Sequence, residues 1–148
     1  MIPLRVACIG RHGQVAQAIA AAAAGYPSIE LHQAGRDGAD LTDPMAVEAF
    51  ILQSRAHLVI NAGSYNFVDR AESEEAVAFA VNAEGPRMLA RLCRRHGVQL
   101  IHMSTDCVFD GAGNEPHDED ETPRPLSAYG RSKLAGEMAV ADNRKSVV

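Results

Sequence analysis

Short apolar runs alternate with longer amphipathic stretches along most of the chain. The apolar runs have the length and composition of buried strands and occupy residues 4–9, 29–34, 57–61, 98–104 and 146–148. The stretches between them carry apolar residues at helical spacing and predict helices at 14–24, 43–51, from 72 onward, 86–96 and 127–142. Strands that alternate with helices form a parallel sheet covered on both faces. The pattern therefore predicts an α/β fold with a doubly wound, Rossmann-like parallel sheet.

Turn and cap residues mark several of the predicted boundaries. Asp43 followed by Pro44 is typical of a helix N-cap with a proline in the first turn. Gly97 is placed to end a helix, because glycine accepts the left-handed conformation that helix C-termini often need. The segment 111–125 combines glycine, proline and many acids, which indicates a surface loop. No repeat or low-complexity linker divides the sequence, so residues 1–148 are expected to form one domain.

Composition narrows the classes of function. The chain has 148 residues with 14 basic and 19 acidic side chains, and its net charge of −5 offers no cationic field to a nucleic-acid partner. No apolar run approaches the roughly 20 residues of a membrane span, and the apolar start of the chain is too short for a signal peptide. The three cysteines and six histidines show no paired or metal-ligand spacing. We therefore expect a cytoplasmic protein with no metal site and no nucleic-acid or membrane partner.

A glycine-rich turn joins the first predicted strand to the first predicted helix. Gly10 permits the tight turn, and Gly13 lets a ligand approach the backbone. The N–H groups at the start of the following helix, at Gln14 and Val15, can hold a pyrophosphate. A plain strand-to-helix turn is the alternative, because two glycines alone are weak evidence. The turn therefore predicts a dinucleotide site only together with other features.

The turn after the second predicted strand has the sequence Gly35-Arg36-Asp37. Dinucleotide folds distinguish the ribose hydroxyl from the ribose phosphate at this point. Arg36 fits a 2′-phosphate, and a solvated turn arginine explains it equally well. The sequence thus predicts NADPH or NADH as the cofactor, with a slight preference for NADPH.

Small residues follow the third predicted strand. Ala62, Gly63 and Ser64 precede Tyr65, and a backbone without bulky side chains lets a flat cofactor lie against it. Farther along, Asn82 lies in predicted helix. It either hydrogen-bonds neighbouring backbone or helps to frame the site.

A hydroxyl and a carboxylate follow the fourth predicted strand, at Thr105 and Asp106. The carboxyl end of a central strand is where such sheets carry out chemistry. Serine, threonine and aspartate also cap strand ends without any further role. Both interpretations stay open from these residues alone.

Tyr129 and Lys133 lie four residues apart at the start of a predicted helix, so both side chains leave the same face. A free tyrosine has a pKa of about 10, and a cationic neighbour favours its phenolate. The pair can therefore protonate a carbonyl oxygen. An aromatic anchor beside a solvated lysine is the alternative, because this spacing is common in helices.

Together these segments resemble the dTDP-4-dehydrorhamnose reductases, which are extended short-chain dehydrogenase/reductases. The resemblance runs from Leu4 to Glu137 and is carried by residues 10–16, 59–65, 68–72, 81–86, 103–111 and 125–137. It implies that Thr105, Tyr129 and Lys133 are catalytic and that Thr105 and Asp106 contact the substrate. It also implies a set of cofactor-binding residues: Gly10, Gly13, Gln14, Val15, Arg36, Asp40, Leu41, Ala62, Gly63, Ser64, Tyr65, Tyr129 and Lys133. Gly63-Ser64 and Cys107 depart from the family pattern.

The resemblance implies NAD(P)H-dependent reduction of a dTDP-linked 4-keto sugar, with a sugar nucleotide as the binding partner. A non-catalytic NAD(P)-binding regulatory subunit, or an epimerase or dehydratase for another sugar nucleotide, is the alternative. In this family the substrate-gripping part follows the position of Val148, so we expect the later strands and the substrate domain to be lacking here. A sheet left short exposes an edge and an apolar face, which favours self-association, and a homodimer is therefore expected.

Overall fold

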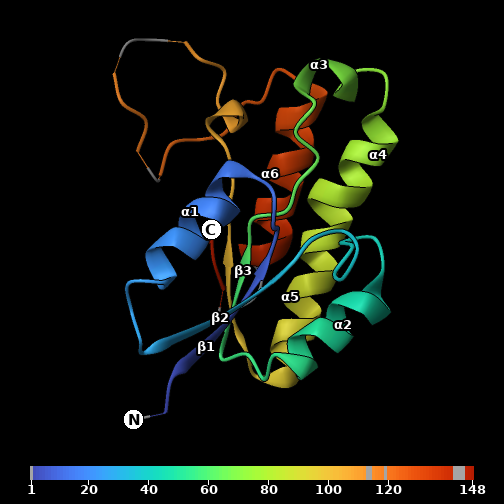
Figure 1. Ribbon diagram of the computed structural model, residues 1–148. Helices are drawn as coiled ribbons and strands as arrows, with labels where there is room; N and C mark the ends of the chain where they lie inside the picture. Colours follow the sequence, from blue (N-terminus) through green and yellow to red (C-terminus); the bar gives the residue numbers. More distant parts are fainter. Residues whose placement is uncertain (1, 113–114, 119, 142–145) are drawn as a thin grey trace.

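The structure is a computed structural model that describes residues 2–112, 115–118, 120–141 and 146–148 (Figure 1). Its strands are β1 (Leu4–Ile9), β2 (Ile29–Ala34), β3 (Leu58–Asn61), β4 (Gln99–His102) and β5 (Ser146–Val147). Its helices are α1 (Gln14–Ala23), α2 (Pro44–Gln53), α3 (Val68–Ala71), α4 (Glu75–Phe79), α5 (Gly85–His96) and α6 (Ala128–Ala141). A π-helical turn, η1 (Ala80–Glu84), precedes α5, and a 3-10 turn, η2 (Asp106–Val108), follows β4.

The five strands form one parallel sheet in the order β2-β1-β3-β4-β5. In the register, Val6 of β1 lies opposite Leu31 of β2 on one side and Leu58 of β3 on the other. From β1 the chain first builds outward to β2 and then returns to build in the opposite direction through β3. The predicted doubly wound sheet is confirmed, and its switch point lies between β1 and β3.

The helices are unequally divided between the two faces of this sheet. Figure 1 shows α1 on one side, with α2, α5 and α6 on the other. Right-handed crossovers require this division, because the β1-to-β2 connection runs in the opposite direction to the later connections. The larger core lies on the α5 and α6 side, where Val59, Leu89, Leu100 and Val140 are fully buried.

Several helix ends lie where the sequence predicted them. Asp43 caps α2 by accepting hydrogen bonds from the backbone N–H groups of Met45 and Ala46. Gly97 ends α5 in the left-handed conformation with φ of 70°. At the start of α6, the Ser127 hydroxyl accepts from the N–H of Gly130.

Other boundaries differ from the predictions. The strand predicted at 98–104 is shorter, because its partner β3 ends at Asn61 and the last ladder bond runs from Met103 N–H to the Asn61 carbonyl. Helical structure begins at Val68 rather than at 72, and the π-turn η1 interrupts it before α5. The helix predicted to reach 142 is described as far as Ala141.

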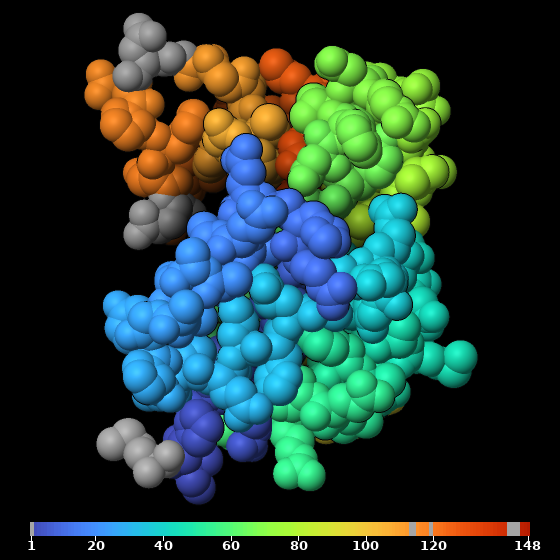
Figure 2. Space-filling view, viewed as in Figure 1, coloured from blue at the N-terminus to red at the C-terminus, as the bar shows by residue number. Residues whose placement is uncertain are grey.

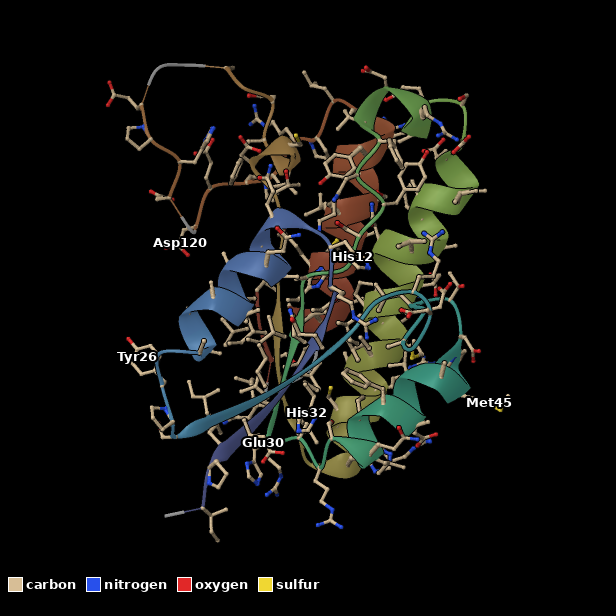
Figure 3. The ribbon with its side chains drawn as sticks, viewed as in Figure 1. His12, Tyr26, Glu30, His32, Met45 and Asp120 are labelled. Atoms are coloured by element: carbon tan, nitrogen blue, oxygen red, sulfur yellow. The ribbon has the colours of Figure 1, made fainter. Side chains whose placement is uncertain are left out.

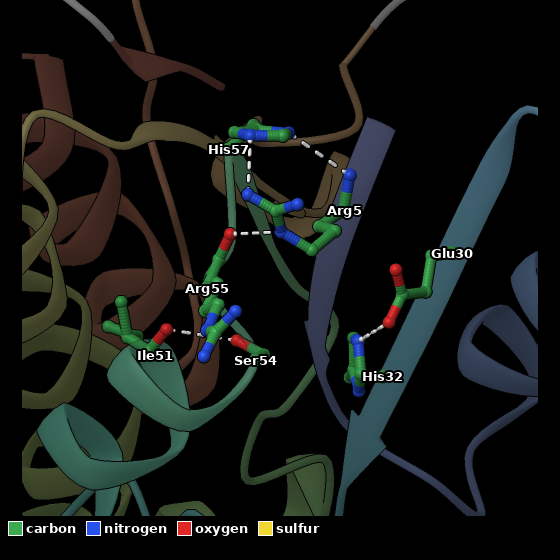
Figure 4. A network of polar contacts seen from close by, with 7 residues as sticks. All are labelled: Arg5, Glu30, His32, Ile51, Ser54, Arg55 and His57. Atoms are coloured by element: carbon green, nitrogen blue, oxygen red, sulfur yellow. Dashed lines mark hydrogen bonds and ion pairs between the residues drawn. The ribbon is translucent and has the colours of Figure 1, made fainter. Parts of the chain in front are cut away.

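The amino ends of the central strands are tied by a polar network (Figure 4). The Arg5 guanidinium donates from Nε to the Arg55 carbonyl at 2.7 Å, and its Nη2 lies 2.9 Å from His57 Nε2. Glu30 and His32 pair separately on the edge strand β2. At this end of the sheet the polar side chains are therefore engaged in structural contacts with one another.

Of the helices in the described ranges, none has the length and hydropathy needed to cross a membrane.

Candidate active site

A hollow of about 470 Å³ lies at the switch point between β1 and β3. Four segments far apart in the sequence line it: the glycine turn, the loop after β3, Met103 and Ser104 after β4, and the buried side of α6. In Figure 2 the blue glycine-turn region reaches between the orange segment that follows β4 and the green segment that follows β3, and Figure 3 labels His12 at this end of the sheet. The predicted site residues that line it are Gly13, Gln14, Val15, Ala62, Gly63, Ser64, Tyr129 and Lys133.

The two glycines of the turn do different things. Gly10 has φ of 127°, and a β-carbon there would lie 3.2 Å from the Ala62 carbonyl carbon, so glycine lets the ends of β1 and β3 approach closely. Gly13 has an ordinary extended conformation, and a β-carbon there would meet nothing within 4 Å. It is the N-cap of α1 and makes no side-chain cap, so no cap side chain occupies the first N–H groups of that helix. This arrangement suits an anion.

A second hollow of about 200 Å³ continues from the first toward β2. Both hollows are lined by Gly63 and Ser64. The smaller hollow is lined in addition by Gly10, Arg36, Asp40 and Leu41. The Asp40 carboxylate accepts from the backbone N–H and hydroxyl of Thr42, and Arg36 Nε lies 3.7 Å from it. These contacts, the Thr42 backbone bond first, lower the pKa of Asp40. The hollow therefore presents both a cation and an anion to a ligand.

Tyr129 and Lys133 lie one turn apart on α6, and both are buried. Lys133 Nζ donates to the Met103 carbonyl at 2.6 Å, and burial lowers the pKa of this amine to about 8. Burial also raises the pKa of Tyr129, and a hydrogen bond with Thr105 partly opposes that rise. From the sequence we expected a cationic neighbour to favour the phenolate of Tyr129. In the structure the stronger influence on the phenol is its removal from water.

Thr105 and Asp106 lie beside the hollow rather than in its lining. The Thr105 hydroxyl caps η2 by accepting from the Cys107 N–H, and it also contacts the Asp106 carboxylate at 3.2 Å. Asp106 is exposed. The geometry therefore agrees with the cap interpretation. The same hydroxyl also acts on the Tyr129 phenol, where it lowers the pKa that burial raises.

Tyr65 stands apart from the other predicted cofactor residues. Its side chain is buried, its hydroxyl donates to Glu74 at 2.6 Å, and it lines neither hollow. The bond to Glu74 is the main cause of the raised pKa of this phenol. In this structure Tyr65 anchors the loop after β3 to the turn before α4.

Asn82 has a role that sequence reasoning only half identified. From the π-turn η1, its amide accepts from the Tyr65 N–H at 2.8 Å and donates to the Tyr65 carbonyl at 3.0 Å. It also donates to the Ser132 hydroxyl, which in turn donates to the Tyr129 carbonyl. The bonded backbone lies 17 residues away in the sequence, so of the two alternatives left open for Asn82 the structure does not show bonding to neighbouring backbone. Asn82 joins the loop after β3 to α6, and π-turns are frequent at functional sites.

His102, which we did not predict from the sequence, is a buried histidine that contacts Asn61 and lies near Lys133. Asn61 Oδ1 accepts from the Gly63 N–H, so its Nδ2 is the donor to His102 Nδ1 at 3.0 Å. The His102 proton is then on Nε2, which has no partner among the described residues. Burial and the neighbouring Lys133 lower the pKa of His102 to about 4. The ring is therefore neutral beneath the lysine.

Comparison with known proteins places this site in a family. A family model described as the RmlD substrate binding domain matches residues 4–148. The chain belongs to this family. The match covers both hollows and the Tyr129–Lys133 pair.

Relatives within this family carry a consistent name. A dTDP-4-dehydrorhamnose reductase of Sinorhizobium fredii is 43% identical over 138 residues, which are 93% of this chain and 46% of the relative. A dTDP-4-dehydrorhamnose reductase of Mycobacterium tuberculosis is 52% identical over 105 residues, which are 68% of this chain and 34% of the relative. The predicted resemblance is confirmed, and the chain spans less than half the length of these relatives.

A solved structure agrees with this family assignment. The dTDP-4-dehydrorhamnose reductase of Bacillus anthracis in complex with NADP superposes with a TM-score of 0.93 at 31% identity. The match covers 99% of this chain and 52% of that chain. The described fold therefore corresponds to about half of the larger protein.

Proposed function

We propose that this chain is the NAD(P)H-binding part of a reductase that converts the 4-keto group of dTDP-4-dehydrorhamnose to the alcohol of dTDP-rhamnose. One observation carries the proposal: a single hollow gathers the glycine turn, the loop after β3 and the Tyr129–Lys133 pair. An anion site and an acid–base pair at the same strand ends fit a nicotinamide enzyme. The names of the relatives supply the sugar nucleotide.

The residues present fit a dinucleotide. The uncapped N–H groups at the start of α1 offer a place for the pyrophosphate, and the space beside Gly13 is open. Leu41, with the backbone of Gly63, gives the smaller hollow an apolar wall for the adenine. When bound, the reduced nicotinamide supplies the hydride.

Tyr129 is the proposed proton donor to the sugar carbonyl oxygen. Its raised pKa keeps the phenol protonated at neutral pH, as a donor requires. Thr105 acts on the pKa of this phenol, and its proposed role is to orient the same carbonyl. Lys133 uses one N–H to hold the Met103 carbonyl, and its other two N–H groups are available to the ribose hydroxyls.

Binding and turnover test different parts of the proposal. A fluorescence titration of this chain with NADPH and NADH tests cofactor binding, which we expect for the chain alone. A steady-state assay with dTDP-4-dehydrorhamnose tests turnover and uses the complete natural protein, because the relatives extend well beyond the matched segment. We expect the chain of residues 1–148 alone to bind cofactor without reducing the sugar.

The decisive variant is Tyr129→Phe in the complete protein. It should reduce turnover by about 10²–10⁴-fold, the usual contribution of a general acid, with cofactor affinity nearly unchanged. Phe67→Leu, which alters an exposed aromatic side chain outside both hollows, is the control and should leave both measurements unchanged. Full activity of Tyr129→Phe would refute the proton-donor role. Cofactor binding without turnover by the complete wild-type protein would favour the regulatory-subunit alternative.

A further inference from the structure

Two neighbouring residues after β4 are bound by two residues that lie one turn apart on α6. Lys133 Nζ donates to the Met103 carbonyl at 2.6 Å, and the Ser104 hydroxyl donates to a carboxylate oxygen of Glu137. The end of β4 and the middle of α6 are therefore joined by two adjacent hydrogen bonds. Lys133, Met103 and Ser104 line the larger hollow, whereas Glu137 does not. Glu137 is thus a carboxylate outside the site that is bonded to a residue inside it.

The ammonium of Lys133 is buried next to a single negative charge. Lys133 is 3% exposed, and its hydrogen bond goes to a neutral carbonyl. Of the described residues, Glu137 on α6 and His102 on β4 interact electrostatically with it, and Tyr129 shares the hollow. The phenol and the imidazole are neutral at pH 7, because burial raises the pKa of Tyr129 and lowers the pKa of His102 to about 4. The charge that opposes the effect of burial on the pKa of Lys133 is therefore that of Glu137, since Asp106 acts on Tyr129 instead.

Ser104 holds this carboxylate in place. Glu137 is half-buried, and the next residue, Met138, is 65% exposed, so this part of α6 borders solvent. The hydrogen bond from Ser104 keeps the carboxylate turned toward the end of β4 rather than toward water. The same bond fixes the residue that immediately precedes Thr105, whose hydroxyl acts on the pKa of Tyr129. One contact with a residue outside the hollow therefore affects both members of the acid–base pair.

We propose that Glu137 is a positioning residue for Lys133 and that Ser104 is the group that orients it. The carboxylate keeps the buried amine in its ammonium form and, through Ser104, holds the end of β4 against α6. The ammonium then has two N–H groups free for the proposed contact with the ribose. The effect on the cofactor rests on the proposed function, whereas the charge of Lys133 is a property of the chain itself.

The first test measures the charge state of Lys133 without any cofactor. The sequence has two lysines, Lys133 and Lys145, so NMR of protein labelled with ¹³C at the lysine ε-carbon gives two signals, which Lys145→Arg assigns. Glu137→Gln keeps the shape of the side chain and an acceptor for Ser104 but removes the charge. It should lower the midpoint of the Lys133 titration by about 0.5–1 pH unit, because a nearby negative charge favours the ammonium. A role of Glu137 in packing alone predicts no change.

Ser104→Ala gives an independent measurement, because it keeps the charge but frees the carboxylate. It should lower the midpoint by less than Glu137→Gln does, and Ser104→Thr, which retains a hydroxyl, should restore the wild-type value. The control is Glu75→Gln, which removes an exposed carboxylate that pairs with Arg131 of the same helix at 3.0 Å. It should leave the midpoint unchanged, and circular dichroism shows that the variants compared are folded.

Two outcomes of these titrations would overturn the role of Glu137: an unchanged midpoint in Glu137→Gln, or an equal change in Glu75→Gln. An unchanged midpoint in Ser104→Ala would overturn the role of Ser104.

The second test extends the measurement to cofactor binding. NADH titrations of the wild type and of Glu137→Gln should agree closely at pH 6, where both proteins carry the ammonium. At pH 8, near the pKa of Lys133, the variant should bind NADH about two- to fivefold more weakly, because a smaller fraction of its amine is charged. An affinity ratio that stays constant with pH, in a variant whose lysine midpoint has moved, would overturn the effect on the cofactor. Wild-type protein that binds no NADH would refute the proposed function, and the lysine titration would still decide the role of Glu137.

Discussion

The α-carbon of Gly136 on α6 lies directly against the carbonyl oxygen of Asn82 in the π-turn η1. A β-carbon at this position would approach that oxygen to under 3.0 Å, which real β-carbons essentially never do. Gly130, on the preceding turns of α6, has the same relationship with the Cys107 carbonyl. The helix that carries Tyr129 and Lys133 therefore packs directly against backbone carbonyl groups at two points. The absence of side chains at Gly130 and Gly136 allows this close approach.

We predict that Gly136→Ala destabilises the protein, although alanine in a helix normally stabilises it by about 1 kcal/mol relative to glycine. The added methyl group must push α6 away from η1, at a cost of about 1–3 kcal/mol or more in the free energy of unfolding. Urea unfolding followed by circular dichroism measures the change. Met138→Gly compared with Met138→Ala, at an exposed position of the same helix, reports helix propensity alone. Increased stability of Gly136→Ala would mean that the two segments can move apart freely.

Gly13→Val separates folding from binding at the glycine turn. Gly13 has an ordinary backbone conformation and open space around its α-carbon, so the folded protein should accept valine with little loss of stability. The same side chain would occupy the space proposed for the pyrophosphate, and NAD(P)H binding should be lost. A titration of the folded variant decides the matter, and unchanged affinity would remove the glycine turn from the cofactor site.

The lysine gives the site a pH dependence with a defined sign. The Lys133 amine has its pKa lowered to about 8, so it is charged below that pH and neutral above it. If the ammonium holds the ribose, NADH affinity should fall as pH rises through about 8. NADH is the better probe, because it lacks the 2′-phosphate of NADPH, whose own titration would also change the affinity with pH. Lys133→Arg stays charged and should lose this alkaline fall, whereas a wild-type affinity independent of pH would argue against the contact.

His102 predicts an acid-sensitive stability. Its pKa is about 4 in the folded protein and 6.5 in a free side chain, so between these values the unfolded chain binds a proton that the folded chain does not. The free energy of unfolding should therefore fall as pH drops from 6.5 toward 4, by at most about 3 kcal/mol. His102→Asn keeps an acceptor for Asn61 and should flatten this fall. His12→Asn, at an exposed position, should not.

Features encoded within one segment were predictable from the sequence. Asp43 and Gly97 mark helix ends through bonds and conformations of their own few residues, and the glycine turn follows a strand whose last four residues are apolar and buried. The hydrogen bonds of Asn82 were not predictable in the same way, because its partner Tyr65 is 17 residues away in the sequence and comes close only in the folded chain. The raised pKa of Tyr129 depends on burial by other segments. The four-residue spacing of Tyr129 and Lys133 gives no information about that burial.

Among the helices that the structure describes, α1 stands alone on its face of the sheet, and this has a consequence for local stability. Only Ala16 of this helix is buried, whereas α5 buries six of its residues. Segments with few buried contacts open and close more often than the rest of a protein, and their amide hydrogens exchange sooner. The helix whose amino end would receive the pyrophosphate is therefore more prone to transient opening than α5. A dinucleotide that binds only its closed form would slow exchange along α1, and part of its binding free energy would be used to keep that helix folded.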